Sequence, residues 1–108
     1  MTSMRSPEYR RRLQELTDYL LATLPASWHE ATLRARFPSR VRTSLEVSFR
    51  SSPHSSQTPV DIPMATTRGL AGAARAVRTE LASTGNPECK TFLFSLSKAG
   101  TSSLDVEY

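Results

Sequence analysis

The side chains best suited to chemistry in this sequence are one cysteine, Cys89, and two histidines, His29 and His54. Catalysis needs a nucleophile, an acid or base, and groups that stabilise charge, all held in one site. Cys89 and His29 each precede a predicted strand, so a cysteine–histidine pair is geometrically conceivable, although no local motif supports it. His54 lies in a segment rich in serine and proline. A small buried residue at the start of a strand is the simpler interpretation of Cys89.

Other sequence motifs that carry chemistry are missing. The sequence has no glycine-rich phosphate loop, no nucleophile elbow and no cysteine–histidine cluster at the spacing of metal ligands. A single cysteine also cannot form a disulfide within the chain. We therefore predict no catalytic residues, no cofactor and no metal site. The expected activity is binding rather than enzymatic catalysis.

The composition is that of a globular domain with a moderate excess of positive charge. The chain has 108 residues, of which 38% are hydrophobic and 22% are charged, and its formal net charge is +4. This length suits one domain with a single modest core. No run of about 18 apolar residues is present. The arginine-rich N-terminus is not followed by the apolar stretch of a signal peptide, so we predict a cytoplasmic protein.

The hydrophobic spacing of the first half predicts a helix followed by a β-hairpin. Apolar residues recur every three or four positions between Pro7 and Pro25, which is typical of a helix with one buried face. After Trp28 the period changes to two. Residues 31–37 and 41–50 alternate apolar and polar side chains, which predicts two antiparallel strands. Trp28 is expected to fill the core between helix and sheet, with an exposed interface anchor as the alternative.

The second half has the same order of elements. Residues 51–63 are rich in serine and proline and are predicted to form a linker. A second helix is expected over residues 64–83, and the Gly-Asn-Pro sequence at 85–87 ends it. Alternation over residues 91–97 and 101–108 predicts a second hairpin.

The two halves also match in sequence. The segment Ser44-Leu45-Glu46-Val47-Ser48-Phe49 aligns with Ser103-Leu104-Asp105-Val106-Glu107-Tyr108 at an offset of 59 residues. Alternation alone explains part of the match, but the shared order and spacing favour an internal repeat. We predict one α+β domain over residues 1–108, with repeats at about 6–50 and 64–108. The duplicated αββαββ unit would form a four-stranded antiparallel sheet with both helices on one face.

The opposite face of such a sheet would be exposed to solvent, basic in its first half and acidic in its second. Glu46 and Asp105 occupy equivalent positions in the two hairpins, which would allow them to lie near each other. This face is a candidate docking surface, although an ordinary solvated face has a similar composition. The candidate partner-binding residues are Arg34, Arg36, Arg42, Glu46, Arg50, Asp105 and Glu107.

The arrangement of these elements resembles that of the YezG-like immunity proteins of bacterial polymorphic toxin systems. The resemblance rests on Leu24-Pro25 followed by Trp28 and on the closing strand Leu104-Asp105-Val106-Glu107-Tyr108, and it covers most of the chain. It implies a cytoplasmic protein that binds and neutralises a toxin, often a nuclease, without chemistry of its own. Many antitoxins are acidic whereas this chain is basic. The resemblance then implies contacts through the acidic half of the sheet, or a toxin with an acidic face.

Two other functions remain open at this point. A nucleic-acid-binding module would use the arginines of the sheet to contact phosphates and would bind less tightly as salt rises. A basic protein favours such partners, although the excess of arginine over lysine can also come from a GC-rich genome. A homo-oligomeric adaptor, such as a homodimer, would pair through the unprotected strand 101–108.

Overall fold

The computed structural model describes residues 7–39, 41–82 and 88–108. Its elements in chain order are α1 (Pro7–Thr23), β1 (Glu30–Arg36), β2 (Ser44–Arg50), β3 (Thr58–Pro59), α2 (Met64–Ala82), β4 (Thr91–Ser97) and β5 (Ser102–Glu107). Both predicted helices and all four predicted strands are present. The predicted start of the first repeat at residue 6 and the helix-ending segment 85–87 lie outside the described residues. Neither described helix is long and apolar enough to cross a lipid bilayer.

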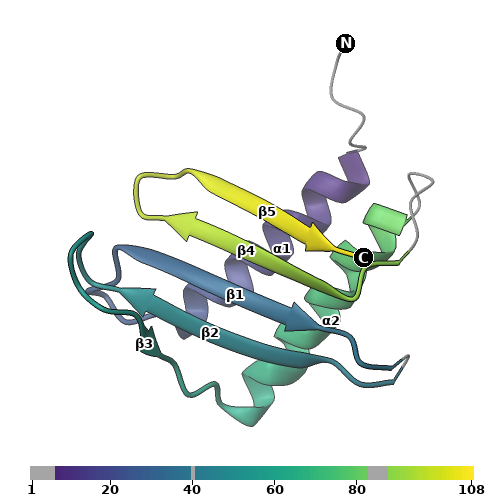
Figure 1. The fold of residues 1–108 in the computed structure, drawn as a ribbon, viewed down its shortest axis with the longest axis horizontal. Helices are drawn as coiled ribbons and strands as arrows, with labels where there is room; N and C mark the ends of the chain where they lie inside the picture. Colours follow the sequence, from purple (N-terminus) through teal and green to yellow (C-terminus); the bar gives the residue numbers. More distant parts are fainter. Residues whose placement is uncertain (1–6, 40, 83–87) are drawn as a thin grey trace.

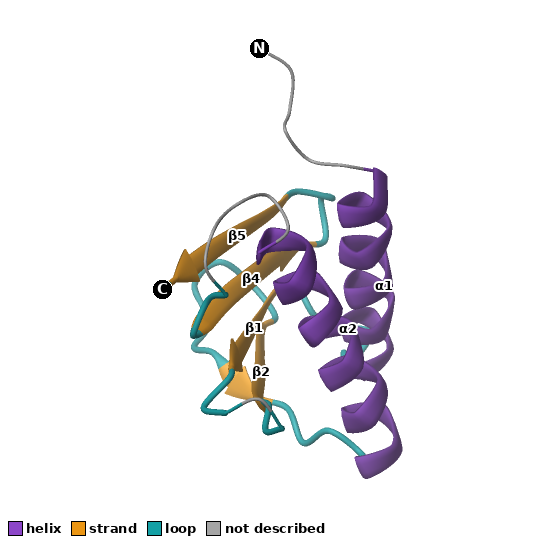
Figure 2. Cartoon of the chain, turned by 90° about the vertical axis from the view of Figure 1, so that its right-hand side faces the viewer, coloured by secondary structure: helices purple, strands orange, loops and turns teal. Residues whose placement is uncertain are grey.

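The elements form two layers, with the two helices packed side by side on one face of an antiparallel sheet (Figures 1 and 2). The strand order is β3-β2-β1-β4-β5. The α+β class and the antiparallel sheet are therefore confirmed, but the prediction of four strands was wrong.

The fifth strand, β3, lies inside the segment predicted to be a linker. Thr58 pairs with Phe49 and Pro59 with Ser48, and the amide of Val60 donates to the carbonyl of Val47 at 2.8 Å. A strand of two residues shows no alternation of side chains. Backbone groups left open along β2 determine this pairing, so hydrophobic periodicity could not reveal it.

The two hairpins share one register. Leu33 of β1 lies opposite Val47 of β2, and the residues 59 positions later, Phe92 of β4 and Val106 of β5, also lie opposite each other. β1 and β4 are adjacent at the centre of the sheet and pair antiparallel, with Leu33 opposite Phe94. The hairpins are thus joined through their first strands, and β2 and β5 lie on opposite sides.

The core lies between the sheet and the two helices. Its fully buried large side chains are Leu16, Leu20, Leu33, Leu70, Val77, Phe92 and Phe94. Each such burial stabilises the fold by about 1.5–3 kcal/mol relative to an exposed side chain. Trp28 is partly buried against this core, as expected for a residue that fills the space between helix and sheet. The Lys98 ammonium lies 5.4 Å from the centre of its ring.

A glycine allows the two helices to approach closely. A Cβ atom at Gly69 of α2 would lie within 2.7 Å of Cζ in the Tyr19 ring of α1. A Cβ atom at Gly72, one turn later on α2, would meet no atom within 4 Å. Only Gly69, therefore, is required by the contact between the helices.

Candidate functional site

The candidate functional residues lie mainly on the outer face of the sheet, which the helices leave uncovered. Successive residues of a strand point to opposite faces. In β1, Ala31, Leu33 and Ala35 are buried toward the helices, so Arg34 and Arg36 lie on the outer face, where both are exposed. The alternation that predicts the strand therefore also determines which side chains are displayed.

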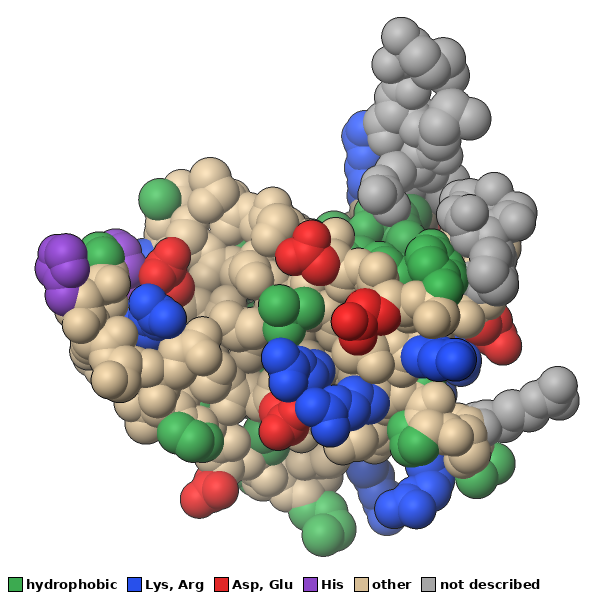
Figure 3. Space-filling model, in the orientation of Figure 1, with side chains coloured by type: hydrophobic (Ala, Val, Ile, Leu, Met, Phe, Trp, Pro, Cys, Tyr) green, Lys and Arg blue, Asp and Glu red, His purple; other side chains and the backbone are tan. Residues whose placement is uncertain are grey.

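The pairing of the strands arranges these side chains in rows. One row across the sheet consists of Glu46, Arg34, Leu93 and Asp105. The two arginines of β1 thus lie between carboxylates of β2 on one side and of β5 on the other. Figure 3 shows the result, with basic side chains near the middle of this face and acidic side chains beside them. The predicted division into a basic and an acidic half is therefore too simple.

Four of the seven predicted partner-binding residues line one shallow hollow of about 340 Å³. Its lining residues are Arg34, Arg36, Thr91, Phe92, Leu93, Asp105 and Glu107. Arg36 forms an ion pair with Glu46 at 3.5 Å. Arg34 has no ion pair within the described part of the chain. Its guanidinium group is therefore available to a ligand.

Leu93 is the functional candidate that the sequence analysis missed. It is half-buried on the outer face of β4, between Arg34 and Asp105. The signal was present in the sequence, because Leu93 is the one apolar residue at an outward position of the strand Thr91–Ser97. The buried centre of a protein interface is more apolar than its rim, which is polar.

The other two predicted arginines lie apart from this hollow. Arg42 is exposed in the loop between β1 and β2, where it lines a separate hollow with Arg36 and Lys90. Arg50 lies at the other end of the sheet, opposite Glu30. The four arginines therefore do not form the continuous stripe that the nucleic-acid-binding hypothesis expects.

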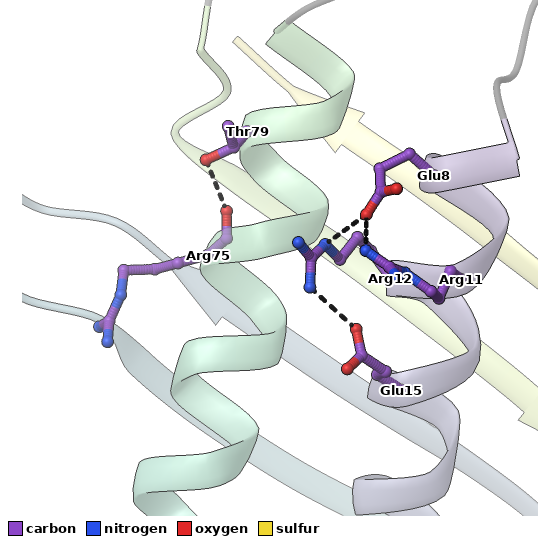
Figure 4. Close-up of polar contacts among 6 residues, drawn as sticks. All are labelled: Glu8, Arg11, Arg12, Glu15, Arg75 and Thr79. Atoms are coloured by element: carbon purple, nitrogen blue, oxygen red, sulfur yellow. Dashed lines mark hydrogen bonds and ion pairs between the residues drawn. The ribbon is translucent and has the colours of Figure 1, made fainter.

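The arginine-rich start of α1 is also accounted for within its own helix. Arg12 lies 3.3 Å from the carboxylate of Glu8 and 3.2 Å from that of Glu15, and Arg11 also pairs with Glu8 (Figure 4). These pairs, three or four residues apart and largely exposed, are typical of a solvated helix face. In the same view the Arg75 side chain of α2 points away from α1; its guanidinium donates to Thr43 at 3.0 Å.

The structure separates the two groups that were considered for a cysteine–histidine pair. His29 directly precedes β1 and Cys89 lies just before β4, but these strands run antiparallel, with Glu30 opposite Ser97 and Arg36 opposite Thr91. His29 and Cys89 therefore lie at opposite ends of the sheet, more than about 20 Å apart, because each lies beyond the end of a seven-residue strand. The pair cannot act together.

Cys89 has the properties of a structural residue. Its exposed fraction is 1%, and burial raises the pKa of its thiol, an effect that the nearby Arg78 guanidinium only partly offsets. A reactive cysteine needs an accessible thiolate. The environment of Cys89 favours the protonated thiol instead.

The two carboxylates at equivalent positions of the hairpins are not neighbours either. Arg34 and Leu93 lie between Glu46 and Asp105. Glu46 and Asp105 are therefore three strand spacings of about 4.8 Å apart, which is about 14 Å. The expectation that Glu46 and Asp105 lie near each other was wrong, because the hairpins join through β1 and β4. Within residues 7–39, 41–82 and 88–108, no three histidine, cysteine, aspartate or glutamate side chains are grouped to hold a metal ion.

Comparison with known proteins adds no family. No protein-family model matches this chain, and no curated protein matches it in sequence.

Proposed function

We propose that this protein is an immunity protein, which binds a partner toxin through the outer face of its sheet and neutralises it. The observation that carries the proposal is the hollow in which Arg34, Leu93, Asp105 and Glu107 converge. An apolar centre with an unpaired guanidinium beside it and carboxylates at the margin provides anchors and orienting charges for a protein partner. The resemblance to YezG-like immunity proteins supports the same function, with the cytoplasm as its location.

The hollow suits recognition better than catalysis. It is a shallow depression on a sheet, and the side chains around it include no histidine or cysteine. A nucleophile and its base would have to lie within hydrogen-bonding reach of each other. His29 and Cys89 belong to opposite ends of the sheet, and Cys89 is buried.

The dimensions of the face indicate how much of the molecule the partner must contact. Four strands of about 20 Å and the two-residue strand β3, spaced about 4.8 Å apart, give a flat area of about 420 Å². A stable interface usually buries about 800 Å² on each partner. The toxin must therefore contact an edge or the loops of the sheet in addition to its face.

We also infer that the two helix–hairpin units, at about residues 6–50 and 64–108, arose by duplication. The shared register of the hairpins supports this, since Leu33 and Val47 pair in the same way as Phe92 and Val106. A duplicated unit would provide two related outer surfaces whose charges have diverged. Of the outward-facing charges of the sheet, Arg34, Arg36 and Glu46 belong to the first unit, and Asp105 and Glu107 belong to the second.

One observation favours a second candidate function. Arg36, Arg42 and Lys90 line one hollow together with Ser44 and Thr91, and no carboxylate lines it. Three cations with two hydroxyl groups could contact phosphates of a nucleic acid. Binding of this kind weakens steeply as salt concentration rises, which separates it from the immunity function.

The test is affinity capture of the tagged protein from lysate of its source cells at about 150 and about 500 mM salt. The captured protein is then co-expressed with this chain in a growth assay. The immunity function predicts one stoichiometric protein at both salt concentrations, whose toxicity this chain suppresses. Replacing Arg34 with Glu and Leu93 with Asp should abolish the suppression. Replacing the exposed helical residue Arg10 with Glu serves as the control.

Two outcomes would contradict the proposal. Nucleic acid that is released at the higher salt concentration would favour the hollow at Arg42 and Lys90. A captured protein that is not toxic, or whose toxicity this chain leaves unchanged, would exclude the immunity function.

A further inference from the structure

The two edges of the sheet differ in how they are protected. At one edge, β3 pairs with part of β2 and carries Pro59, which has no amide proton to offer another strand. At the other edge lies β5, and no described residue pairs with its outer side. Short strands and prolines are common means of blocking an edge. Only the β3 edge has them.

The backbone groups on the outer side of β5 can be assigned from its pairing with β4. The amide of Ser97 donates to the carbonyl of Thr101 at 2.9 Å, and the amide of Lys90 donates to that of Glu107 at 2.8 Å. Hydrogen-bonded and non-hydrogen-bonded positions alternate along an antiparallel pair. The amides and carbonyls of Leu104 and Val106 therefore point away from β4 and are open to another strand.

The side chains of β5 add a specific pattern to this open backbone. Asp105 and Glu107 are exposed on the outer face, and their neighbours across the strand pair are Leu93 and Thr91. Neither carboxylate has an ion pair within the described part of the chain. On the face that the helices cover, Leu104 and Val106 are only partly buried, so part of each side chain remains exposed.

We propose that β5 accepts a β-strand from a protein partner, and that this strand carries basic residues at alternate positions. Residues two apart on a strand are separated by about 7 Å. Lysine or arginine at two such positions would lie beside Asp105 and Glu107, and apolar residues between them would cover Leu104 and Val106. Peptide recognition by strand addition combines backbone hydrogen bonds with side-chain selection in this way. The proposal rests on the proposed function, since the toxin would supply the strand.

The same carboxylates disfavour a second copy of this chain as the occupant. If two β5 strands paired with Asp105 opposite Asp105, like charges would meet directly, which destabilises a strand pair. A register with Leu104 opposite Leu104 places Asp105 opposite Ser103, but it still gathers four carboxylates on one face. Unpaired charges of one sign select against the wrong partner as well as for the right one.

The experiment uses the whole protein, labelled with ¹⁵N, and two synthetic peptides. One peptide, acetyl-Thr-Lys-Val-Lys-Val-Thr-amide, carries the proposed pattern; the other has glutamate in place of both lysines. Binding is measured by fluorescence anisotropy, and amide hydrogen exchange is followed by NMR. We expect the lysine peptide to bind at least about tenfold more tightly than the glutamate peptide. It should also slow exchange at the amides of Leu104 and Val106.

A charge-reversed protein makes the test specific for β5. The variant Asp105→Lys/Glu107→Lys should invert the preference and bind the glutamate peptide more tightly. The matched control Asp18→Lys/Asp61→Lys changes the net charge equally at exposed positions away from β5 and should retain the original preference. A lysine peptide N-methylated at both valines lacks part of the backbone needed for strand pairing and should protect neither amide.

Several results would overturn the proposal. They are equal binding of both peptides, loss of the preference in the control variant, absence of protection at Leu104 and Val106, or protection along β2 instead. The failure of this proposal can be distinguished from failure of the proposed function. If a captured toxin is still neutralised by the Asp105→Lys/Glu107→Lys variant but not by Arg34→Glu/Leu93→Asp, the immunity function holds and the toxin does not add a basic strand at β5.

Discussion

Arg78 connects three elements of the fold, and its removal is the sharpest test of how the sheet is attached to α2. The Nε–H of Arg78 donates to the carbonyl of Cys89 at 2.8 Å. Its guanidinium carbon lies 4.6 Å from the centre of the Phe37 ring, just beyond the end of β1. Its ion pair with Glu88 is long, at 4.0 Å, and the Glu88 side chain is 58% exposed.

The expected magnitude follows from these contacts. A hydrogen bond from a charged donor contributes about 1.5–3 kcal/mol, and a cation–π contact contributes about 0.5–1 kcal/mol. We therefore expect Arg78→Ala to lower the free energy of unfolding by about 2–4 kcal/mol. Arg78→Lys keeps the charge but loses the planar donor, so it should cost about half as much. Glu88→Gln removes only an exposed ion pair and should change stability by less than about 0.5 kcal/mol.

The assay is urea denaturation followed by far-UV circular dichroism and by the fluorescence of the single tryptophan, Trp28. The change should be found in the midpoint, with the slope against urea unaltered. A loss smaller than about 1 kcal/mol for Arg78→Ala would refute the structural role assigned to the hydrogen bond. A loss for Glu88→Gln equal to that for Arg78→Ala would show that the ion pair is the main interaction.

Further predictions concern the helix contact and the buried thiol. Gly72→Ala should raise the free energy of unfolding by about 0.5–1 kcal/mol, because alanine favours helix and the space is open. Gly69→Ala should show a smaller gain or a loss, because Tyr19 must move; equal gains in urea denaturation would contradict this. The raised pKa of Cys89 means that the unfolded chain loses the thiol proton first. The stability that the protonated thiol provides is complete below its unfolded pKa, about 8.5, and is lost as pH rises through the higher folded pKa. Cys89→Ala should reduce the decline measured between about pH 8 and pH 10, and the native thiol should react slowly with a thiol reagent until urea is added.

The faces of the strands could be predicted from the sequence, but their neighbours could not. Side-chain alternation identifies Leu33 and Phe92 as core residues and Arg34 as an outward one, because the pleat requires it. Alternation contains no information about which edges of two hairpins meet. The pairing of β1 with β4 therefore separates Glu46 from Asp105, which were expected to lie near each other, and it also separates His29 from Cys89, a pair that no local motif had supported.

The residues of the candidate site could likewise be predicted from the sequence, but their grouping in one hollow could not. Arg34, Arg36, Asp105 and Glu107 were identified as outward charged residues, and the structure brings all four to one hollow. Their grouping depends on the strand order and not on any local motif. Leu93 was overlooked because an isolated leucine on a strand usually indicates core. Its position becomes informative only when the two faces of β4 are separated.

The central pairing of β1 with β4 also has a consequence for the order of folding. Each hairpin joins strands that are close in sequence, whereas Leu33 meets Phe94 about 60 residues later, and such distant contacts form slowly. The two hairpins can therefore form before β1 pairs with β4. Substitutions where β1 pairs with β4, such as Leu33→Ala, should slow folding. Substitutions at positions whose contacts form after this pairing should mainly accelerate unfolding. The pairing of β1 with β4, which creates the outer face of the sheet, would then also limit the rate at which the chain folds.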